Sequence, residues 1–249
     1  MELRIIGTSA AFPGKNDACS SYLIDAGPGS LADIQEFTGY ADLSGIFLSH
    51  LHADHISDFY TLRYAVQAAQ REGRMARPFP LYMPLKPGYL HSFIRRTCLR
   101  SSPGSFRVVA LDERLTLDLD GLEASFLRTK HPVETYAMRF RPPGNASPPA
   151  GGAFVYTSDT AYFPALVQFC RGAGLLLAEA TLQDKDEEME GMGHMSAARA
   201  GALAGDAGAR LLVLTHIWPE YDRSVSLQQA GRTFAGEIRL AERGALYTL

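Results

Sequence analysis

The residues best suited to chemistry lie in one short run, H-x-H-x-D-H, formed by His50, His52, Asp54 and His55. Imidazole and carboxylate groups are the ligands that zinc and similar borderline metals prefer. Because His50 and His52 are two residues apart, they project the same way from an extended segment, and the residues that follow can turn towards a second ion. A purely structural role is a poor alternative, since histidines packed this closely would repel one another when protonated.

Further histidines and carboxylates follow apolar, strand-like runs. They are His131 after 122–129, Asp159 after 154–158, Glu179 after 175–178 and His216 after 211–215, with His194 just before a helix that Ser196 can cap. In layered α/β proteins the ends of buried strands are where ligands and catalytic groups gather. These residues are therefore candidates for the same site as the histidine cluster. Of the seven histidines, only His91 lies outside this pattern.

Each of these residues also has an ordinary structural explanation. Asp159 could cap the helix that begins near Phe163, and His131 and His194 could be surface-loop histidines. Glu179 is harder to explain in this way, because a carboxylate at the end of a buried apolar strand is costly unless it is paired. On spacing alone, the metal and capping roles of Asp159 both stay open.

The hydrophobic pattern predicts strands that alternate with helices. Strands are expected at 3–6, 21–25, 46–49, 81–83, within 106–119, and at 122–129, 136–140, 154–158, 175–178 and 211–215. Helices are expected at 30–37, 54–71, 88–100, 163–170, 196–207 and 224–234. The segment 141–152, with four prolines and three glycines, and the acidic segment 184–190 are expected to be loops. This alternation indicates an α/β protein.

The composition limits the classes of protein that fit. With 249 residues, 46% of them hydrophobic, the chain can form one large domain or two small ones. A net charge of −3 and a pI near 6.2 argue against a generally basic nucleic-acid-binding protein. No apolar run has transmembrane length, and the first residues lack the features of a signal peptide. The three cysteines form no C-x-x-C pair, so a reducing cytoplasm is the expected location.

Charge is unevenly distributed along the chain. The stretch 61–107 contains nine lysines and arginines and a single acidic residue, Glu72. Such a stretch could attract phosphate groups. It could equally be a solvated helical face or a subunit contact.

On these residues the chain resembles the metallo-β-lactamase superfamily. A strand, the segment LSHLHADH and a helix match its signature, and His131, Asp159 and His216 follow in the expected order. The segments LAEAT at 177–181 and GHMS at 193–196 are similar to the ribonuclease Z and cyclic phosphodiesterase branch. The similarity extends from Gly7 to Tyr221. It implies a four-layer αββα metallo-β-lactamase sandwich, with residues 1–249 as a single domain.

The resemblance implies two divalent metal ions, with zinc as the first expectation and manganese as the alternative. The first ion would be held by His50, His52 and His131, the second by Asp54, His55 and His216, and Asp159 would bridge them. The catalytic residues implied are Asp54, which can take a proton from the attacking water, His194, which assists the leaving group, and Glu179, which orients His194 or keeps it protonated. Asp25 is expected to hydrogen-bond the ligand loop without touching metal.

Three departures from the family pattern narrow the expected function. Only 27 residues separate His131 from Asp159, so the arm with which ribonuclease Z enzymes grip tRNA is not expected. Members of the family normally have a longer hairpin before the segment that corresponds to 25–29. Here a single strand leads into that segment, so one strand is expected to be missing, which would alter one edge of the sheet. The cysteine cluster of the phosphonate-pathway cyclic phosphodiesterases is also absent from the sequence.

The sequence therefore predicts a metal-dependent phosphodiesterase. Its substrates would be cyclic nucleotides or RNA phosphodiesters, attacked by a hydroxide shared between two ions. The alternatives are a lactone or thioester hydrolase of the same fold, or a non-catalytic metal-binding protein. The expected partners are a small phosphodiester or RNA end and a second copy of the chain, and no membrane. The contact between the copies is expected in the basic and aromatic stretch after the histidine cluster.

Overall fold

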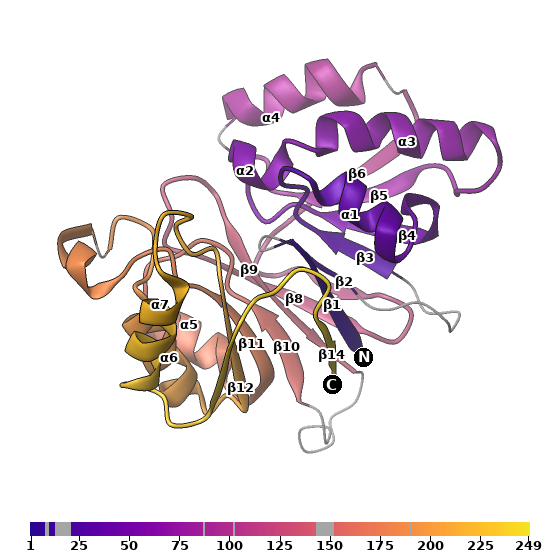
Figure 1. The fold of residues 1–249 in the computed structure, drawn as a ribbon. Coiled ribbons are helices and arrows are strands. Elements are labelled where there is room, and N and C mark those ends of the chain that lie inside the picture. Colours follow the sequence, from indigo (N-terminus) through magenta and orange to yellow (C-terminus); the bar gives the residue numbers. More distant parts are fainter. Residues whose placement is uncertain (8–9, 13–20, 87, 102, 143–151, 190) are drawn as a thin grey trace. The chain divides into compact units, whose positions relative to one another are not determined.

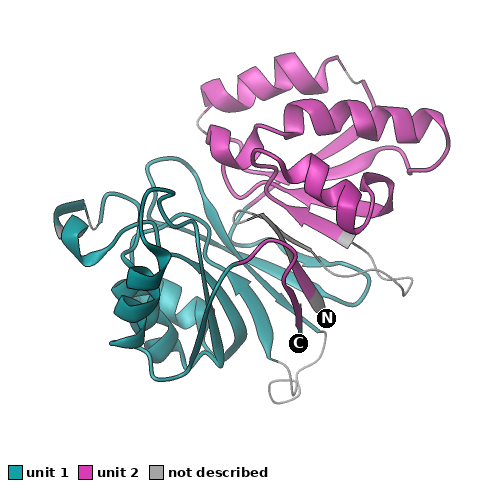
Figure 2. Cartoon of the chain, in the orientation of Figure 1, with its two compact units in different colours: residues 1, 112–241, 248–249 teal, residues 2–111, 242–247 magenta. Residues whose placement is uncertain are grey.

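The computed structural model describes residues 1–7, 10–12, 21–86, 88–101, 103–142, 152–189 and 191–249. The chain falls into two compact units (Figure 2). Unit 1 consists of residues 1, 112–241 and 248–249, and unit 2 consists of residues 2–111 and 242–247. The prediction that 1–249 forms one domain stays a prediction.

Unit 2 is built on a seven-stranded sheet with the order β14-β1-β2-β3-β4-β5-β6. The strands are β1 (Glu2–Gly7), β2 (Ala10–Phe12), β3 (Ser21–Ile24), β4 (Leu43–Phe47), β5 (Phe79–Met83), β6 (Phe106–Ala110) and β14 (Leu246–Thr248). β1, β2 and β3 pair antiparallel, whereas β3 to β6 pair parallel. The parallel part places the carboxyl end of β4, and thus the histidine cluster, at an edge where several strands end.

The helices of unit 2 lie along one side of this sheet (Figure 1). They are α1 (Ser30–Phe37), α2 (Ala53–Ile56), α3 (Phe59–Arg71) and α4 (Gly88–Ile94), with a 3₁₀ turn at Tyr40–Asp42 and a π-helical turn at Arg95–Leu99. The core between sheet and helices includes Ile46, Leu48, Phe59 and Leu62, all fully buried. The polar cluster at the end of β4 therefore follows a strand that is fixed by apolar packing.

Unit 1 is built on a second seven-stranded sheet with the order β13-β12-β11-β10-β9-β8-β7. The strands are β7 (Thr116–Asp118), β8 (Glu123–Arg128), β9 (Tyr136–Arg141), β10 (Ala153–Tyr156), β11 (Ala173–Glu179), β12 (Leu211–Thr215) and β13 (Glu237–Leu240). β10 to β13 run parallel, and β7 to β10 pair antiparallel. Every residue of β11 is buried, as expected of a central parallel strand.

The helices of unit 1 are α5 (Pro164–Cys170), α6 (Ala197–Ala207) and α7 (Arg223–Gly231), with a 3₁₀ segment at Asp184–Met189. They lie beside the parallel strands of this unit (Figure 1). The predicted start of α6 is confirmed, because Ser196 caps the helix and its Oγ accepts a hydrogen bond from the Arg199 backbone N–H at 3.3 Å. The cap fixes the start of α6 and thereby the segment with His194 and Met195 that leads into this helix.

Three expectations from the sequence are corrected here. The helix expected at 54–71 is two helices, α2 and α3, because Asp58 is held elsewhere: its N–H donates to the Ala26 carbonyl and its carboxylate accepts from the Leu31 N–H. The acidic segment expected as a loop forms a 3₁₀ turn, in which Asp186 accepts from the Gln183 N–H. The strand expected to be missing is present as β2, whose three residues are too few to show a pattern. The loop expected at 141–152 lies mostly outside the described residues.

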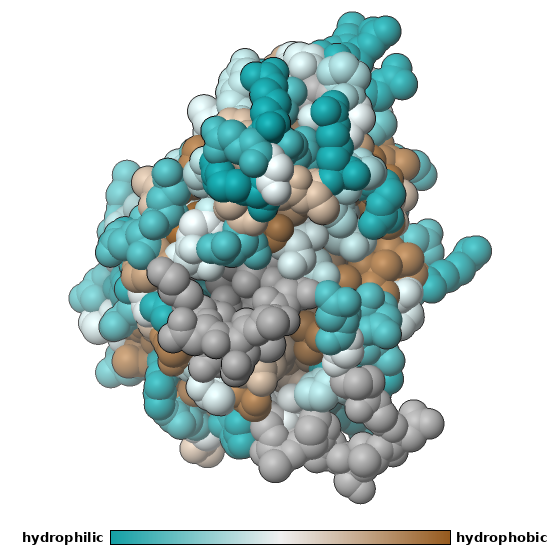
Figure 3. Space-filling view, turned by 90° about the vertical axis from the view of Figure 1, so that its right-hand side faces the viewer, coloured by the Kyte–Doolittle hydropathy of each residue, from teal (hydrophilic) through white to brown (hydrophobic). Residues whose placement is uncertain are grey.

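The exposed surface mixes polar and apolar groups. Figure 3 shows one face on which hydrophilic side chains predominate and apolar ones form small separate patches. The most exposed large hydrophobic residues include Tyr64, Tyr89, Phe93, Met192 and Trp218. Within the part of the chain that the structure describes, no helix is both long and apolar enough to span a bilayer.

Candidate metal centre

In unit 2, the histidine cluster follows the end of β4 and is anchored by Asp25. Asp25 lies just after β3 and is fully buried. Its carboxylate accepts from the Ser49 N–H at 2.6 Å and from the Ser49 hydroxyl at 2.8 Å. The expectation that Asp25 hydrogen-bonds the loop of the histidine cluster is therefore confirmed. The loop is held by a buried carboxyl group rather than by regular secondary structure.

His50 and His52 point ring nitrogens at one another. The distance from His50 Nε2 to His52 Nδ1 is 3.1 Å, and Ser49 Oγ lies 3.2 Å from His50 Nδ1. Two nitrogens that bind one tetrahedral zinc ion at about 2.0–2.1 Å lie roughly 3.3 Å apart. The observed spacing therefore fits two ligands of one ion, as the sequence predicted for this pair.

His55 is held by Asp25 on one side and faces Asp54 on the other. Its Nδ1 lies 2.8 Å from Asp25 Oδ2, and its Nε2 lies 3.4 Å from Asp54 Oδ2. His55 is fully buried, whereas the Asp54 side chain is 56% exposed. A carboxylate on Nδ1 leaves Nε2 as the ring nitrogen for metal, which is the usual arrangement around metal-binding histidines. The pair Asp54 and His55 thus suits a second ion.

In unit 1, His131 follows β8 and is held by a glycine. His131 Nδ1 lies 2.9 Å from the carbonyl oxygen of Gly193. Gly193 has a φ of +113°, and a Cβ there would lie 2.6 Å from Pro132 Cδ and 3.0 Å from His131 Nδ1. Burial lowers the pKa of His131, although the Gly193 hydrogen bond and the charge of Asp159 oppose this shift. His131 is therefore disposed to be neutral, the form that binds metal.

Asp159 and His216 follow β10 and β12 and lie close together. The distance from His216 Nε2 to Asp159 Oδ1 is 3.6 Å, and His216 Nδ1 lies 2.9 Å from Thr181 Oγ1. His216 has a φ of +53° and Ser158, next to Asp159, has a φ of +51°. Non-glycine residues in this left-handed region are uncommon and often mark functional sites. Asp159 does not cap α5, whose first turn follows Phe163.

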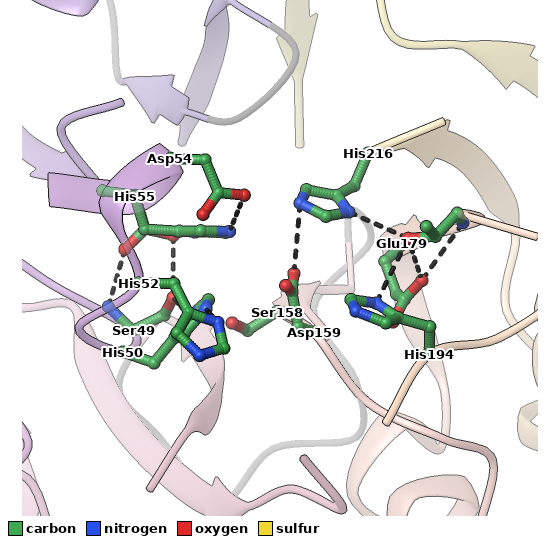
Figure 4. Close-up of polar contacts among 12 residues, drawn as sticks. Ser49, His50, His52, Asp54, His55, Ser158, Asp159, Glu179, His194 and His216 are labelled. Atoms are coloured by element: carbon green, nitrogen blue, oxygen red, sulfur yellow. Dashed lines mark hydrogen bonds and ion pairs between the residues drawn. The ribbon is translucent and has the colours of Figure 1, made fainter. Parts of the chain in front are cut away.

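A third polar contact in unit 1, after those of His131 and His216, joins Glu179 and His194. Glu179 is fully buried at the end of β11, where its carboxylate accepts from the N–H groups of Thr160 and Thr181 at 2.8 and 3.1 Å. His194 Nδ1 lies 3.0 Å from Glu179 Oε1 (Figure 4). Burial alone would lower the pKa of His194, but the hydrogen bond and charge of Glu179, helped by Asp159, raise it.

Sequence reasoning assigned no role to Thr181, Ser49 or Gly193. Thr181 Oγ1 donates to Glu179 Oε2 at 2.7 Å and lies 2.9 Å from Nδ1 of His216 and 3.3 Å from Nδ1 of His194. It therefore connects the carboxylate to two histidines. Thr181 and Gly193 lie in the segments that carry the family resemblance, and Ser49 directly precedes the histidine cluster. Their nearness to these motifs was the only indication in the sequence of a role for them.

The donor set fits divalent metal. In His50, His55, His131 and His216 a protein oxygen lies against Nδ1, which leaves Nε2 as the ring nitrogen that could bind metal. His52 differs, because its Nδ1 faces His50. Imidazole and carboxylate with few other donors suit zinc or a similar ion better than calcium or magnesium. The residues of groups with this metal-binding potential are His50, His52, Asp54 and His55 in unit 2 and His131, Asp159 and His216 in unit 1.

A mixed α/β fold with histidine and aspartate clusters at strand ends is the arrangement of a metallo-hydrolase. Residues 21–217 match the sequence profile of the family described as beta-lactamase superfamily domain. The chain belongs to this family, and its fold is the metallo-β-lactamase fold. The predicted fold class and family are confirmed.

Three relatives show where the chain stands in the family. It is 30% identical to the probable metallo-hydrolase YhfI of Bacillus subtilis over 99% of both chains. The crystal structure of YhfI superposes with a TM-score of 0.85, at 26% identity and over 99% of this chain and 98% of that one. The chain is also 27% identical to ribonuclease Z of Nocardia farcinica, covering 97% of this chain and 95% of the relative. The short form of human tRNase Z shares the fold, with a TM-score of 0.73, 20% identity and coverage of 100% and 99%.

Proposed function

We propose that the protein is a metal-dependent phosphodiesterase whose substrates are cyclic nucleotides or RNA phosphodiesters. The observation that carries the proposal is the buried Glu179 carboxylate against Nδ1 of His194, at 3.0 Å. A histidine oriented in this way presents Nε2 and can hand a proton to a leaving oxygen. An alkoxide leaving group, as in a nucleotide, needs such a proton.

The metal ions would be held by the residues predicted from the sequence. That ligand set comprises His50, His52, Asp54, His55, His131, Asp159 and His216. When bound, two divalent ions, with zinc as the first expectation, would activate a water molecule and neutralise charge on the phosphate. The Asp54 side chain is 56% exposed and is the group that would accept the proton of the attacking water.

The likeness to ribonuclease Z supports a phosphodiester as substrate. Relatives of that name match nearly the whole chain in sequence. The short interval of 27 residues between His131 and Asp159 favours a small phosphodiester over tRNA. A lactone or thioester hydrolase is the second candidate, but ester hydrolysis has less need of the Glu179 and His194 pair.

The first test is hydrolysis of bis(p-nitrophenyl) phosphate by protein reloaded with zinc or with manganese. We expect turnover that a chelator abolishes and that metal restores. Protein with full metal occupancy and no turnover on this ester or on 2′,3′-cyclic AMP would contradict the proposal. Hydrolysis of thioesters or lactones by that same protein would then favour the second candidate.

The role of His194 is tested by comparing two substrates that differ in their leaving groups. His194→Ala should keep its metal content and lose roughly 10²- to 10⁴-fold in kcat on 2′,3′-cyclic AMP. The loss on bis(p-nitrophenyl) phosphate should be smaller, because p-nitrophenolate leaves readily without a proton. His91→Ala, a change at the histidine outside the predicted site, is the matched control and should leave both rates unchanged. Equal losses on both substrates would contradict a proton-donating role.

A homodimer located in the cytoplasm is proposed as well. The aromatic residues Tyr64, Tyr89 and Phe93 are exposed within the basic stretch 61–107 of unit 2, which suits a subunit contact. Light scattering on the purified protein measures the mass directly. A monomer at all concentrations would exclude this contact.

A further inference from the structure

Unit 1 contains a pocket that is lined in part by His194 and whose other lining residues have no role in the proposed chemistry. Its volume is about 260 Å³, and it is lined by Ala161, Tyr162, Gly191, His194, Met195 and Arg199. Pockets for drug-sized ligands are larger, at about 300–1,000 Å³. This pocket therefore has room for one ring system, and not for a run of several nucleotides.

Two of the lining side chains offer flat surfaces. The Arg199 guanidinium lies over the ring of Tyr162, with Cζ 6.0 Å from the ring centroid. The Tyr162 hydroxyl donates to Asp206 Oδ2 at 2.8 Å, which fixes the ring against α6. Tyrosine rings and guanidinium planes are the groups on which proteins stack nucleic acid bases.

The other lining residues favour a base over a second phosphate as the ligand of this pocket. Met195 is 1% exposed and contributes a polarizable thioether, which packs well against ring edges. Phosphate sites usually combine several N–H donors and cations, whereas Arg199 is the single arginine or lysine among the lining residues. Ala161 and Met195 would give a phosphate no hydrogen-bonding side chain. None of the residues that line the pocket is acidic, so an electron-rich ring is not repelled.

We propose that this pocket binds the base of a nucleotide substrate, stacked on Tyr162 and Arg199, and so places its phosphodiester at His194. The proposal rests on the phosphodiesterase function and narrows the substrate to nucleotides with an accessible base. Tyr162 and Arg199 are then specificity residues, which contact the substrate but not the reacting atoms.

The test compares two ligands that differ only in the base. AMP and ribose 5-phosphate are titrated by calorimetry into the metal-loaded protein, whose metal content is measured first. A stacked base is worth roughly 5- to 100-fold in affinity, so AMP should bind tighter than ribose 5-phosphate by that factor. Tyr162→Leu should remove most of this preference and leave ribose 5-phosphate binding unchanged. Tyr162→Phe keeps the ring and should keep the preference.

Arg199→Lys separates stacking from charge, and its exposed position on α6 makes the substitution tolerable for folding. The AMP preference should fall in this variant, since lysine keeps the charge but has no plane. Equal binding of AMP and ribose 5-phosphate to the unchanged protein would overturn the proposal, as would a parallel loss of both ligands in Tyr162→Leu or full retention in Arg199→Lys. Because binding is measured without turnover, base-dependent binding by a protein inactive on phosphodiesters would refute the proposed function alone.

Discussion

Asp25 Oδ2 lies 2.8 Å from Nδ1 of His55, and both side chains are fully buried in unit 2. The backbone N–H and the hydroxyl of Ser49 both donate hydrogen bonds to this carboxylate and hold it in place. A buried carboxylate on Nδ1 fixes the tautomer and orientation of an imidazole and makes Nε2 a better ligand. Asp25 therefore fixes the His55 ring and leaves its Nε2 as the nitrogen that could bind metal.

Replacing this carboxylate should weaken metal binding. Asp25→Asn keeps the size of the side chain but removes the charge, and its amide N–H₂ group faces donors. We expect metal affinity to fall about 10- to 100-fold, as is usual when such a partner is lost. Competition against a chelator, read by metal analysis, measures the change. Asp42→Asn, an exposed position in the same unit, is the control, and equal affinities in the two variants would contradict the assigned role.

Glu179 should act on the reaction through His194. Its carboxylate accepts from Thr160 and Thr181, so Glu179→Gln places an amide against those donors and removes the charge that favours protonated His194. We expect unfolding free energy to fall by about 1–3 kcal/mol, and kcat on 2′,3′-cyclic AMP to fall with little change in KM.

Leaving-group dependence distinguishes this positioning role from a general loss of structure. The kcat of Glu179→Gln should fall less on bis(p-nitrophenyl) phosphate than on the cyclic nucleotide, as for His194→Ala. The exposed Glu188→Gln serves as control. Identical losses on both substrates would show that Glu179 only stabilises the fold.

Gly193 should be intolerant of any side chain. At a φ of +113°, a Cβ would lie 2.6 Å from Pro132 Cδ and 3.0 Å from Nδ1 of His131. Gly193→Ala should therefore displace His131, lower the metal bound per chain, and cost about 1–3 kcal/mol from backbone strain. Gly191→Ala is the matched control, since its φ is +90° and a Cβ there has nothing within 4 Å. Undiminished metal in Gly193→Ala would exclude His131 as a ligand held by this contact.

The buried thiols should be inert in the folded protein. Burial raises the pKa of Cys170 to about 12 and also raises the pKa of Cys98, and both side chains are fully buried. At pH 8 roughly one Cys170 thiol in ten thousand is ionised. Alkylation followed by peptide mass spectrometry should find both cysteines unmodified in native protein and modified after denaturation. Rapid labelling of Cys170 at pH 8 without denaturant would contradict this burial.

Some features of the molecule followed directly from the sequence. The apolar runs at 175–178 and 211–215 became β11 and β12, because strands buried on both faces must be continuously apolar. The helix at 30–37 has the bounds that its pattern predicted. The histidine cluster indicated metal because few other roles tolerate so many imidazoles together.

Other features were decided by contacts between distant parts of the chain. The break between α2 and α3 arises because Asp58 bonds to residues 26 and 31, which local helix propensity cannot report. Thr181 contacts Glu179 and two histidines, and these contacts depend on the register in which the strands pair. The sequence alone thus predicted a set of residues that could bind metal. Tertiary structure decided which ring nitrogen each histidine presents, because that choice depends on oxygen atoms up to 62 residues away, as with Gly193 and His131.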